Sequence, residues 1–409
     1  MKDYPRVLVT TNTCISPSHG TGAVLLKHFN QYPPDRLLNV YLDERGLPSW
    51  PASVRAYQVG SRRWSAAWCQ GLGGRAGRKF LRVFGASHNQ MRVPSFEDVR
   101  SRLQILGFQP DVIYANGYSL HDLALLRQLI AAYGPTVPVI QHFHDYQRDA
   151  GGLFYSLLDE LSPHLTEVWT LTESMAADVR SRLGRAVEVV STFRSDVPPD
   201  FKRTHQELNR NFQVVLLGNV WRPEVLQDLR RAWGICQSQH KLPVIRWIGH
   251  PKQIELLRKA QIQIEPEICY TGFEERLHEV LVKADMAILP LNRGNTPADD
   301  YERFSLPSRI TDFACAGLPI FCIAGGETET KRYVDGNGIG ICASPSEGSS
   351  FAEKLLTFMA DTKTREQCGA RARQLAERDF ALEPYQQFLY SKLTAVASHR
   401  IKPIRLQNR

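Results

Sequence analysis

The sequence predicts an α/β protein of two domains, each built on a parallel sheet. Short apolar runs of strand length alternate with helix-length segments along all 409 residues. The runs are continuously apolar, which is typical of parallel strands covered on both faces. The chain is too long for one ordinary core and fits two domains of about 200 residues. Because 43% of the residues are apolar and 22% are charged, both domains can bury a core.

The first series of elements predicts an N-terminal domain over residues 1–199. Strands are expected at Arg6–Thr11, Leu37–Leu42, Val112–Ala115, Val137–Phe143, Glu167–Leu171 and Val187–Val190. Helices are expected at Ala23–Tyr32, Ser119–Tyr133 and Glu173–Leu183. Thr172 is a good cap and Gly184 a good stop signal for the last of these helices.

A segment without periodicity, Arg194–Asp200, contains two prolines and predicts the linker. A second domain is expected over residues 200–382. Its strands are expected at Gln213–Leu217, Val244–Ile248, Met286–Leu289, Ile320–Ile323 and Gly340–Cys342. Its helices are expected at Glu224–Gln239, Gln253–Ala260, Glu275–Ala284, Arg309–Ala316 and Phe351–Ala360. In open sheets of this kind, ligands bind at the carboxyl ends of the strands.

The composition argues against several classes of protein. No apolar run approaches the ~18 residues of a membrane helix, and the chain opens on an apolar strand instead of a signal peptide. The eight cysteines are scattered, without metal-ligand spacing, and are expected to be reduced core thiols of a cytosolic protein. The net charge of +8 raises nucleic-acid binding as an alternative, but no helix-turn-helix, zinc or RNA-binding signature accompanies it.

The excess positive charge is concentrated between residues 45 and 95. This basic stretch contains nine Arg and Lys residues and no Asp or Glu. Trp50, Trp64 and Trp68 lie among the cations, and Trp prefers the water–lipid interface. An anionic membrane surface is therefore the expected partner, with an acidic polysaccharide, the phosphates of a substrate, a basic insert and a merely solvated basic surface as alternatives.

Two polar segments follow strands of the first domain. A glycine-rich turn, Gly20-Thr21-Gly22, opens the first helix, where backbone amides can approach an anion, although such turns also serve only as turns. His142-Phe143-His144-Asp145 ends the fourth strand. Because strand ends face the site, His144 is expected to be functional, the alternative being a histidine satisfied by a neighbouring carboxylate.

The most specific motif is the segment Phe304–Pro319. Pro307 and Ser308 are expected to open a helix, with Ser308 as its N-cap, which places Arg309 in the first turn. A cation there is unfavourable to the helix dipole and indicates a negative ligand. A strand–helix–strand unit with clear start and stop signals for its helix would explain the same residues without a ligand.

A second turn, Gly325-Gly326, lies between a strand and the next expected helix. Its amides could bind a diphosphate, whereas a flexible turn is the plainer interpretation. Its place beside the previous motif favours a function.

Together these motifs resemble a retaining GT-B glycosyltransferase, close to glycosyltransferase family 4. Members carry a glycine-rich loop after the first strand and a His at the end of a first-domain strand. They also carry a Pro-Ser-Lys-like segment running into an acid and Ala-x-Gly-x-Pro, then a Gly-Gly-x-x-Glu-like turn. The resemblance implies two Rossmann-like domains with parallel sheets facing across a cleft. It makes 1–199 the acceptor domain and 200–382 the donor domain, with a helix at about 383–396 crossing back to the first; a helix capping the second domain is the alternative.

The resemblance also assigns roles. It implies a transfer of a sugar, with retention, from a UDP- or GDP-linked donor to an acceptor hydroxyl. Asp312 matches the acid that binds the nucleotide ribose and Arg309 the lysine that binds the diphosphate. Phe304 stands where the family has its first glutamate, and the nearest acid is Glu302. The implied catalytic residues are His144, Arg309 and Arg222. The implied donor-binding residues are Asp312, Ser308, Pro307, Leu306, Gly325, Gly326, Glu327, Asn219 and Glu302, and Gly20, Thr21 and Gly22 form the acceptor or phosphate loop.

No cofactor and no essential metal are expected, since no Asp-x-Asp site stands out. A lipid-linked or polysaccharide acceptor is expected, with the protein in the cytoplasm and in peripheral contact with the inner face of the membrane. Three other functions fit the same motifs: a GT-B sugar-nucleotide epimerase, a GT-B phosphorylase, and a non-catalytic sugar-nucleotide-binding protein.

Overall fold

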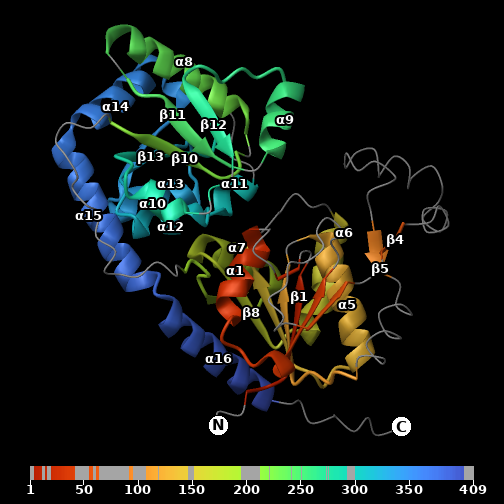
Figure 1. Cartoon of the computed structure of the whole chain (residues 1–409). Coiled ribbons are helices and arrows are strands. Elements are labelled where there is room, and N and C mark those ends of the chain that lie inside the picture. Colours follow the sequence, from red (N-terminus) through yellow and green to blue (C-terminus); the bar gives the residue numbers. More distant parts are fainter. Residues whose placement is uncertain are drawn as a thin grey trace, which may run out of the picture. The chain divides into compact units, whose positions relative to one another are not determined.

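The computed structural model describes residues 4–11, 14–15, 20–41, 55–58, 61–63, 92–94, 107–117, 119–145, 152–194, 212–220, 222–240, 242–249, 251–272, 274, 276–292 and 300–399. The chain divides into two compact units (Figure 1). Unit 1 comprises Met1–Thr192 with Glu383–Arg409, and unit 2 comprises Phe193–Leu382. The division therefore falls ahead of the predicted boundary at residues 199 and 200, and the C-terminal segment belongs with the N-terminal unit.

Unit 1 contains a parallel sheet of seven described strands. In order they are β3 (Arg55–Gln58), β2 (Leu37–Tyr41), β1 (Val7–Thr11), β6 (Val112–Asn116), β7 (Val139–Phe143), β8 (Glu167–Thr170) and β9 (Glu188–Val189). β1 lies between β2 and β6, with Val7 opposite both Leu37 and Val112. Every residue of β1, β2, β6 and β7 is buried, as the continuously apolar sequence predicts.

Two helices of unit 1, α5 and α7, begin at a capping side chain and end at a glycine. The described helices of unit 1 are α1 (Gly20–Phe29), α5 (Leu120–Tyr133), α6 (Gly152–Leu161), α7 (Glu173–Leu183) and α16 (Leu382–Ser398), with short 3-10 turns η1 (Pro34–Arg36) and η2 (Ser162–His164). Ser119 and Asp122 form a capping box at α5, and Thr172 caps α7. Gly184 ends α7 at φ 60°, a left-handed conformation that favours glycine. A separate antiparallel pair joins β4 (Ser61–Arg63) to β5 (Arg92–Pro94).

The C-terminal helix α16 is part of the core of unit 1. Leu389 and Leu393 are fully buried in a cluster with residues of β1, β6 and α1. The Tyr390 hydroxyl donates to the carbonyl of His28 at 2.8 Å, and Gln386 donates to the carbonyl of Lys27 at 2.6 Å. These contacts fix α16 against the second half of α1.

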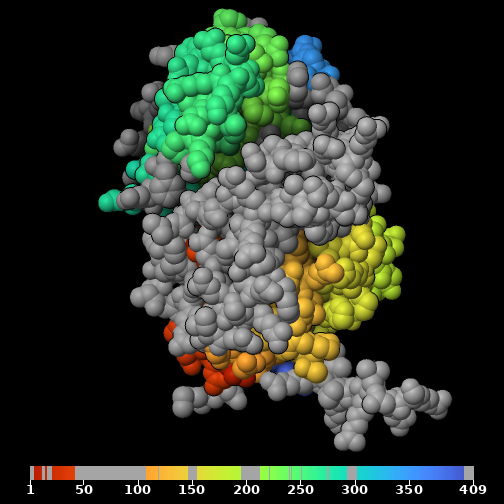
Figure 2. Space-filling model, turned by 90° about the vertical axis from the view of Figure 1, so that its right-hand side faces the viewer, coloured from red at the N-terminus to blue at the C-terminus, as the bar shows by residue number. Residues whose placement is uncertain are grey.

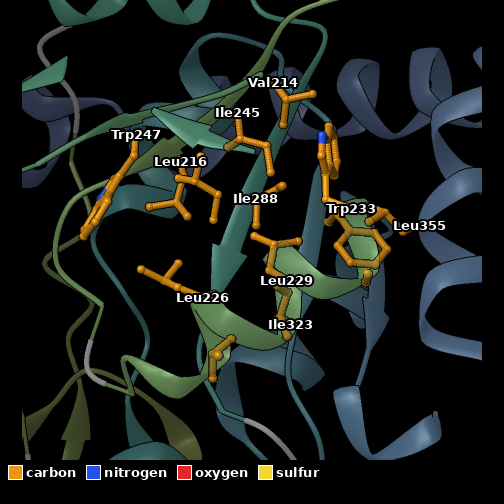
Figure 3. Close-up of a cluster of buried hydrophobic side chains, with 14 of the residues drawn as sticks. Val214, Leu216, Leu226, Leu229, Trp233, Ile245, Trp247, Ile288, Ile323 and Leu355 are labelled. Carbon is orange, nitrogen blue, oxygen red and sulfur yellow. The ribbon is translucent and has the colours of Figure 1, made fainter. Parts of the chain in front are cut away.

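Unit 2 contains a parallel sheet of six described strands. In order they are β12 (Ile268–Gly272), β11 (Ile245–Ile248), β10 (Val214–Leu217), β13 (Met286–Pro290), β14 (Ile320–Ile323) and β15 (Gly340–Ala343). Its helices are α8 (Glu224–Gln239), α9 (Lys252–Lys259), α10 (Leu277–Leu281), α11 (Asp300–Phe304), α12 (Arg309–Cys315), α13 (Glu329–Asn337), α14 (Ser349–Ala360) and α15 (Thr362–Asp379), with the 3-10 turn η3 (Pro345–Glu347). Side chains of the strands, of α8 and of α14 point toward one another in the core drawn in Figure 3, which includes Leu229, Trp233 and Leu355.

Several elements of unit 2 differ from the sequence prediction: β12, α11 and α15 were not predicted, and α10 is shorter than predicted. β12 is the edge strand of its sheet, and green residues of unit 2 lie on the face of the molecule that Figure 2 shows. α10 spans only Leu277–Leu281, within the longer helix predicted over 275–284. The prediction that the cysteines are core thiols is wrong for Cys269, which is exposed on β12; Cys69 lies outside the described residues. No helix among the described residues is long and apolar enough to cross a membrane.

Candidate functional site

The carboxyl ends of three neighbouring strands of unit 2 are joined by one chain of hydrogen bonds. Arg222, after β10, donates from Nε to Glu302 Oε1 at 2.6 Å. Asn292, after β13, donates from Nδ2 to Glu302 Oε2 at 3.2 Å. The Oδ1 atom of the same Asn292 accepts from the backbone amide of Gly325, after β14, at 2.8 Å. We call these four residues the strand-end chain.

The strand-end chain is buried at its centre and open at one end. Glu302 is 3% exposed and Asn292 is 5% exposed, whereas the Arg222 side chain is about half exposed. A buried carboxylate is costly unless it is paired and hydrogen-bonded, and both oxygens of Glu302 have such a partner. The arrangement holds a guanidinium partly in solvent at the edge of the sheet where ligands of such folds bind.

A second arginine lies at the same edge. Arg309, at the start of α12, is buried and donates from Nη1 to the carbonyl of Leu217 at 2.5 Å. The next residue, Gly218, has φ 81°, and a Cβ built there would lie 3.7 Å from Arg309 Nη1. The guanidinium therefore packs against the turn that leads from β10 to the exposed Asn219.

The predicted segment around Arg309 departs from the expected capping. Ser308 occupies the predicted N-cap position directly ahead of Arg309, but it is exposed, lies in the helical region at φ −57°, and makes no side-chain cap hydrogen bond. Leu306 is buried, while Pro307 and Asp312 are half-buried. Phe304 is 5% exposed, and an ionised glutamate buried at this position would need a partner.

The Gly325-Gly326 turn also differs in detail from its prediction. Gly325 is buried and its amide is already bonded to Asn292, so that N–H does not point to a ligand. Gly326 is exposed with φ 69°, a conformation that favours glycine. α13 begins three residues after Gly326, capped by Thr328, whose side chain accepts from the amide of Lys331. Glu327 is exposed and pairs with Arg332 at 3.6 Å.

In unit 1, His144 lies in a buried group of rings at the end of β7. It is 8% exposed, and Asn116 Nδ2 at the end of β6 lies 2.9 Å from its Nδ1 atom. The ring of His142 meets that of His144 edge-on with centroids 4.5 Å apart, and the ring of His28 lies 6.4 Å away. Gly20, Thr21 and Gly22 form the first turn of α1, the helix that also carries His28.

Burial keeps His142 and His144 neutral. Burial, and then His142 and His28, hold the pKa of His144 well below its usual value. Burial lowers the pKa of His142 to about 3 and raises the pKa of Asp145 to about 7. His144 can therefore offer a hydrogen bond to a neutral hydroxyl, but not a positive charge.

The structure thus joins Arg222 to Glu302 directly and Glu302 to Gly325 through Asn292. It also packs Arg309, at the start of α12, against the turn after β10 that carries Asn219. His144 and the Gly20–Gly22 turn belong to unit 1. Sequence reasoning missed Asn292, although it lies three residues after the end of a predicted strand, which is the one signal that could have found it. No group of three or more His, Cys, Asp or Glu residues within the described part of the chain could hold a metal ion.

No family model and no curated protein matches the sequence. Solved structures do match the fold. Anabaena HepE in complex with UDP and glucose matches with a TM-score of 0.63 at 14% identity, over 96% of this chain and 100% of that chain. A glycosyltransferase from Rickettsia africae ESF-5 matches with a TM-score of 0.63 at 10% identity, over 97% and 100% of the two chains. The trehalose-6-phosphate synthase OtsA matches with a TM-score of 0.62 at 12% identity, over 95% and 99%. At these identities the likeness establishes the fold, and the predicted fold class is confirmed: the chain has the GT-B fold, with two Rossmann-like units on parallel sheets.

Proposed function

We propose that this protein is a glycosyltransferase that moves a sugar from a nucleoside-diphosphate sugar to an acceptor hydroxyl, with retention of the anomeric configuration. The observation that carries the proposal is the pair of arginines at the carboxyl ends of the unit 2 strands. Arg222 is held there by Glu302, and Arg309 by the carbonyl of Leu217. The similar fold of HepE, which was solved with UDP and glucose, supports a nucleotide sugar as the ligand.

The chemistry fits the residues of unit 2. A diphosphate leaving group gains charge as the glycosidic bond breaks, and preorganised cations lower the barrier by stabilising that charge. Arginine is suited to this task because its planar fork matches phosphate oxygens. In this proposal Arg309 and Arg222 face the diphosphate, Asp312 accepts from the ribose hydroxyls, and Asn219 and the segment Leu306–Ser308 line the nucleotide. Gly326 and Glu327 complete the turn beside the phosphates.

The residues of unit 1 suit the uncharged groups of the reaction, the transferred sugar and the acceptor hydroxyl. A neutral, buried His144 can offer one hydrogen bond to a sugar or acceptor hydroxyl beside its contact with Asn116. The first turn of α1 offers backbone amides at Gly20, Thr21 and Gly22. We propose that these groups orient the transferred sugar and the acceptor, with no cofactor and no essential metal. Activity that persists in a chelator would support this point, and strict dependence on an added divalent ion would overturn it.

The proposal extends to the acceptor and to the place of action. Nine cations without an acid between residues 45 and 95 favour a lipid-linked acceptor, or an acidic polysaccharide, at the inner face of a membrane. The protein would then be cytoplasmic and peripheral. The side chains of this basic stretch lie outside the described residues.

The first experiment compares the melting temperature of the pure protein with and without UDP, and with and without GDP. Binding to the folded state raises the melting temperature, so one of the two is expected to stabilise the protein. Release of the nucleotide from its sugar conjugates then tests turnover. Conversion of the donor to an isomer without any acceptor would indicate an epimerase, and nucleotide binding without turnover would indicate a binding protein.

Two variants test the roles proposed for Arg309 at the diphosphate and Asp312 at the ribose. Arg309→Ala should lower kcat by about 10²- to 10³-fold, the range for loss of one donor to a developing charge. Asp312→Ala should raise KM more than it lowers kcat, since ribose contacts hold substrate and transition state alike. Arg365→Ala is the matched control: this arginine also donates to a backbone carbonyl of unit 2, that of Phe358, but at the end of α14. Wild-type kinetics in both site variants would refute the assignment.

A further inference from the structure

The strand-end chain has two members whose polar groups are turned toward the protein. Both carboxylate oxygens of Glu302 and both polar atoms of the Asn292 amide are bonded to protein groups. Each of the two residues is at least nine-tenths buried. The two residues lie between the parts that would meet a ligand, the Arg222 guanidinium at one end and the Gly325-Gly326 turn at the other.

We infer that Glu302 and Asn292 are positioning residues, which fix Arg222 and the Gly325-Gly326 turn in the geometry that receives the donor diphosphate. The inference rests on the proposed function for the identity of the ligand. Glu302 does not grip the transferred sugar in this account; it acts through Arg222 on one side and through Asn292 on the other.

In the strand-end chain, the donors and acceptors of each residue fix how its neighbour must be oriented. Glu302 can only accept, so Asn292 must turn its NH2 group toward it. That orientation leaves the Asn292 oxygen for the amide of Gly325. A change at either residue that reverses donor and acceptor therefore breaks one of the three bonds, whichever way the side chain rotates.

Two single substitutions would each break one of these three hydrogen bonds. In Glu302→Gln, the new NH2 group faces either the NH2 group of Asn292 or Arg222 Nε. In both orientations two donors face each other and one hydrogen bond is lost. In Asn292→Asp, two carboxylates face each other at the same place. Each single variant should weaken UDP binding about tenfold, the effect of one lost charge-assisted hydrogen bond.

The double variant Asn292→Asp/Glu302→Gln restores the pattern with the direction of one bond reversed. The new amide at position 302 then accepts from Arg222 through its oxygen and donates through its NH2 group to the new carboxylate at position 292. The second oxygen of that carboxylate accepts from the amide of Gly325. Because all three bonds are remade, the double variant should recover most of the affinity that either single variant loses. Such non-additivity is the signature of two residues acting as a unit, and a merely local loss of stability would not produce it.

The experiment measures two quantities for the wild type, the two single variants and the double variant: the dissociation constant for UDP, or for GDP if only GDP stabilises the wild type, and hydrogen exchange of the peptide over residues 320–328 without nucleotide. Exchange at the Gly325-Gly326 turn should be faster in both single variants and return toward the wild-type rate in the double variant. Glu267→Gln is the matched control, because Glu267 is also largely buried and accepts from an arginine Nε, that of Arg230, at 2.7 Å. This control should change neither quantity.

The outcomes separate the inference from the proposed function. A double variant as impaired as the single variants in both measurements would overturn the inference, as would single variants that leave exchange of the turn unchanged. If the wild type binds neither UDP nor GDP, the proposed donor site is wrong. The exchange rates then still decide whether Glu302 and Asn292 hold the turn.

Discussion

A buried neutral histidine makes stability depend on pH at the scale of one residue. His142 is fully buried; Tyr114 Oη lies 2.7 Å from its Nδ1 atom and the carbonyl oxygen of Val190 lies 2.9 Å from its Nε2 atom. Both ring nitrogens thus have a hydrogen-bond partner that suits the neutral ring: Nδ1 can accept from the Tyr114 hydroxyl, and Nε2 can donate to the Val190 carbonyl. Burial lowers the pKa of His142 from 6.5 to about 3, so the folded state resists protonation that the unfolded state accepts.

We expect the contribution of His142 to the free energy of unfolding of unit 1 to fall as the pH is lowered from about 6.5 toward about 3. In this window the unfolded chain binds a proton at His142 that the folded chain does not, which costs about 1.4 kcal/mol per pH unit. Asp145 acts in the opposite sense: its pKa is raised from 3.8 to about 7, so its contribution is present below 3.8 and is lost as the pH rises through about 7.

The variant His142→Gln isolates the first of these contributions. Urea unfolding at about pH 5 and about pH 7 should show a smaller loss of stability on acidification than in the wild type, by up to about 2 kcal/mol. His399→Gln is the control, since His399 is exposed. Equal acid sensitivity in wild type and His142→Gln would show that His142 does not carry the effect.

At the scale of an element, β15 can be tested through its first residue. A Cβ built on Gly340 would lie 2.0 Å from the carbonyl oxygen of Ile320 on β14, and neither backbone can move away without breaking the sheet. Gly340→Ala should therefore destabilise unit 2 by about 3 kcal/mol, at the upper end of overpacking costs. Gly336→Ala in α13 meets nothing within 4 Å and should be neutral or stabilising by up to about 1 kcal/mol. Equal urea midpoints for the two variants would contradict the close approach of β14 and β15.

Helix α16 offers a second matched pair. Leu389 is fully buried, whereas its neighbour Phe388 is 39% exposed. Leu389→Ala should cost about 2–5 kcal/mol through the cavity it leaves, and Phe388→Ala less than about 1 kcal/mol. Hydrogen exchange in mild urea should locate the loss in the peptides of β1 and β6 and leave those of β10 and β13 unchanged. Faster exchange in β10 and β13 instead would show that α16 stabilises the other unit.

Elements were predictable from the sequence where one local signal dominates. The continuously apolar strands and the helix between Thr172 and Gly184 were found with nearly their observed bounds. β12 was missed because an edge strand alternates buried and exposed residues, so Cys269 and Thr271 interrupt the apolar run. α15 was missed because it is highly charged and the residues it buries are mostly small, including Gly369 and Ala372, which gives a weak helical period.

At the scale of the whole molecule, the sequence predicted which residues lie at strand ends but not which of them bond. Arg222 and Glu302 were both candidates, yet 80 residues separate them, and only the order of the strands brings them to 2.6 Å. The partner that completes the strand-end chain, Asn292, carries no charge and no motif. Its role follows from tertiary contacts with residues 10 and 33 positions away.

The basic stretch leads to a prediction for the intact protein. The cations Arg78, Lys79 and Arg82 lie next to Phe80, Leu81, Val83 and Phe84. Each cation near an anionic leaflet contributes about 1 kcal/mol, and the aromatic and aliphatic neighbours add contact with the interface. The protein should therefore float with liposomes that contain anionic lipid but not with neutral ones, and salt should weaken the binding because it screens the charges.

A matched pair of charge reversals separates this stretch from the net charge of the protein. Arg78→Glu/Lys79→Glu/Arg82→Glu should abolish flotation. Lys252→Glu/Arg258→Glu/Lys259→Glu reverses three exposed cations on α9 in unit 2 and changes the net charge equally, yet it should float as the wild type does. If both triple variants lose binding to the same extent, the attraction comes from net charge and not from the basic stretch. Equal recovery of the wild type with anionic and neutral vesicles, or binding to neither, would refute a membrane contact and leave the soluble polysaccharide as the acceptor to test.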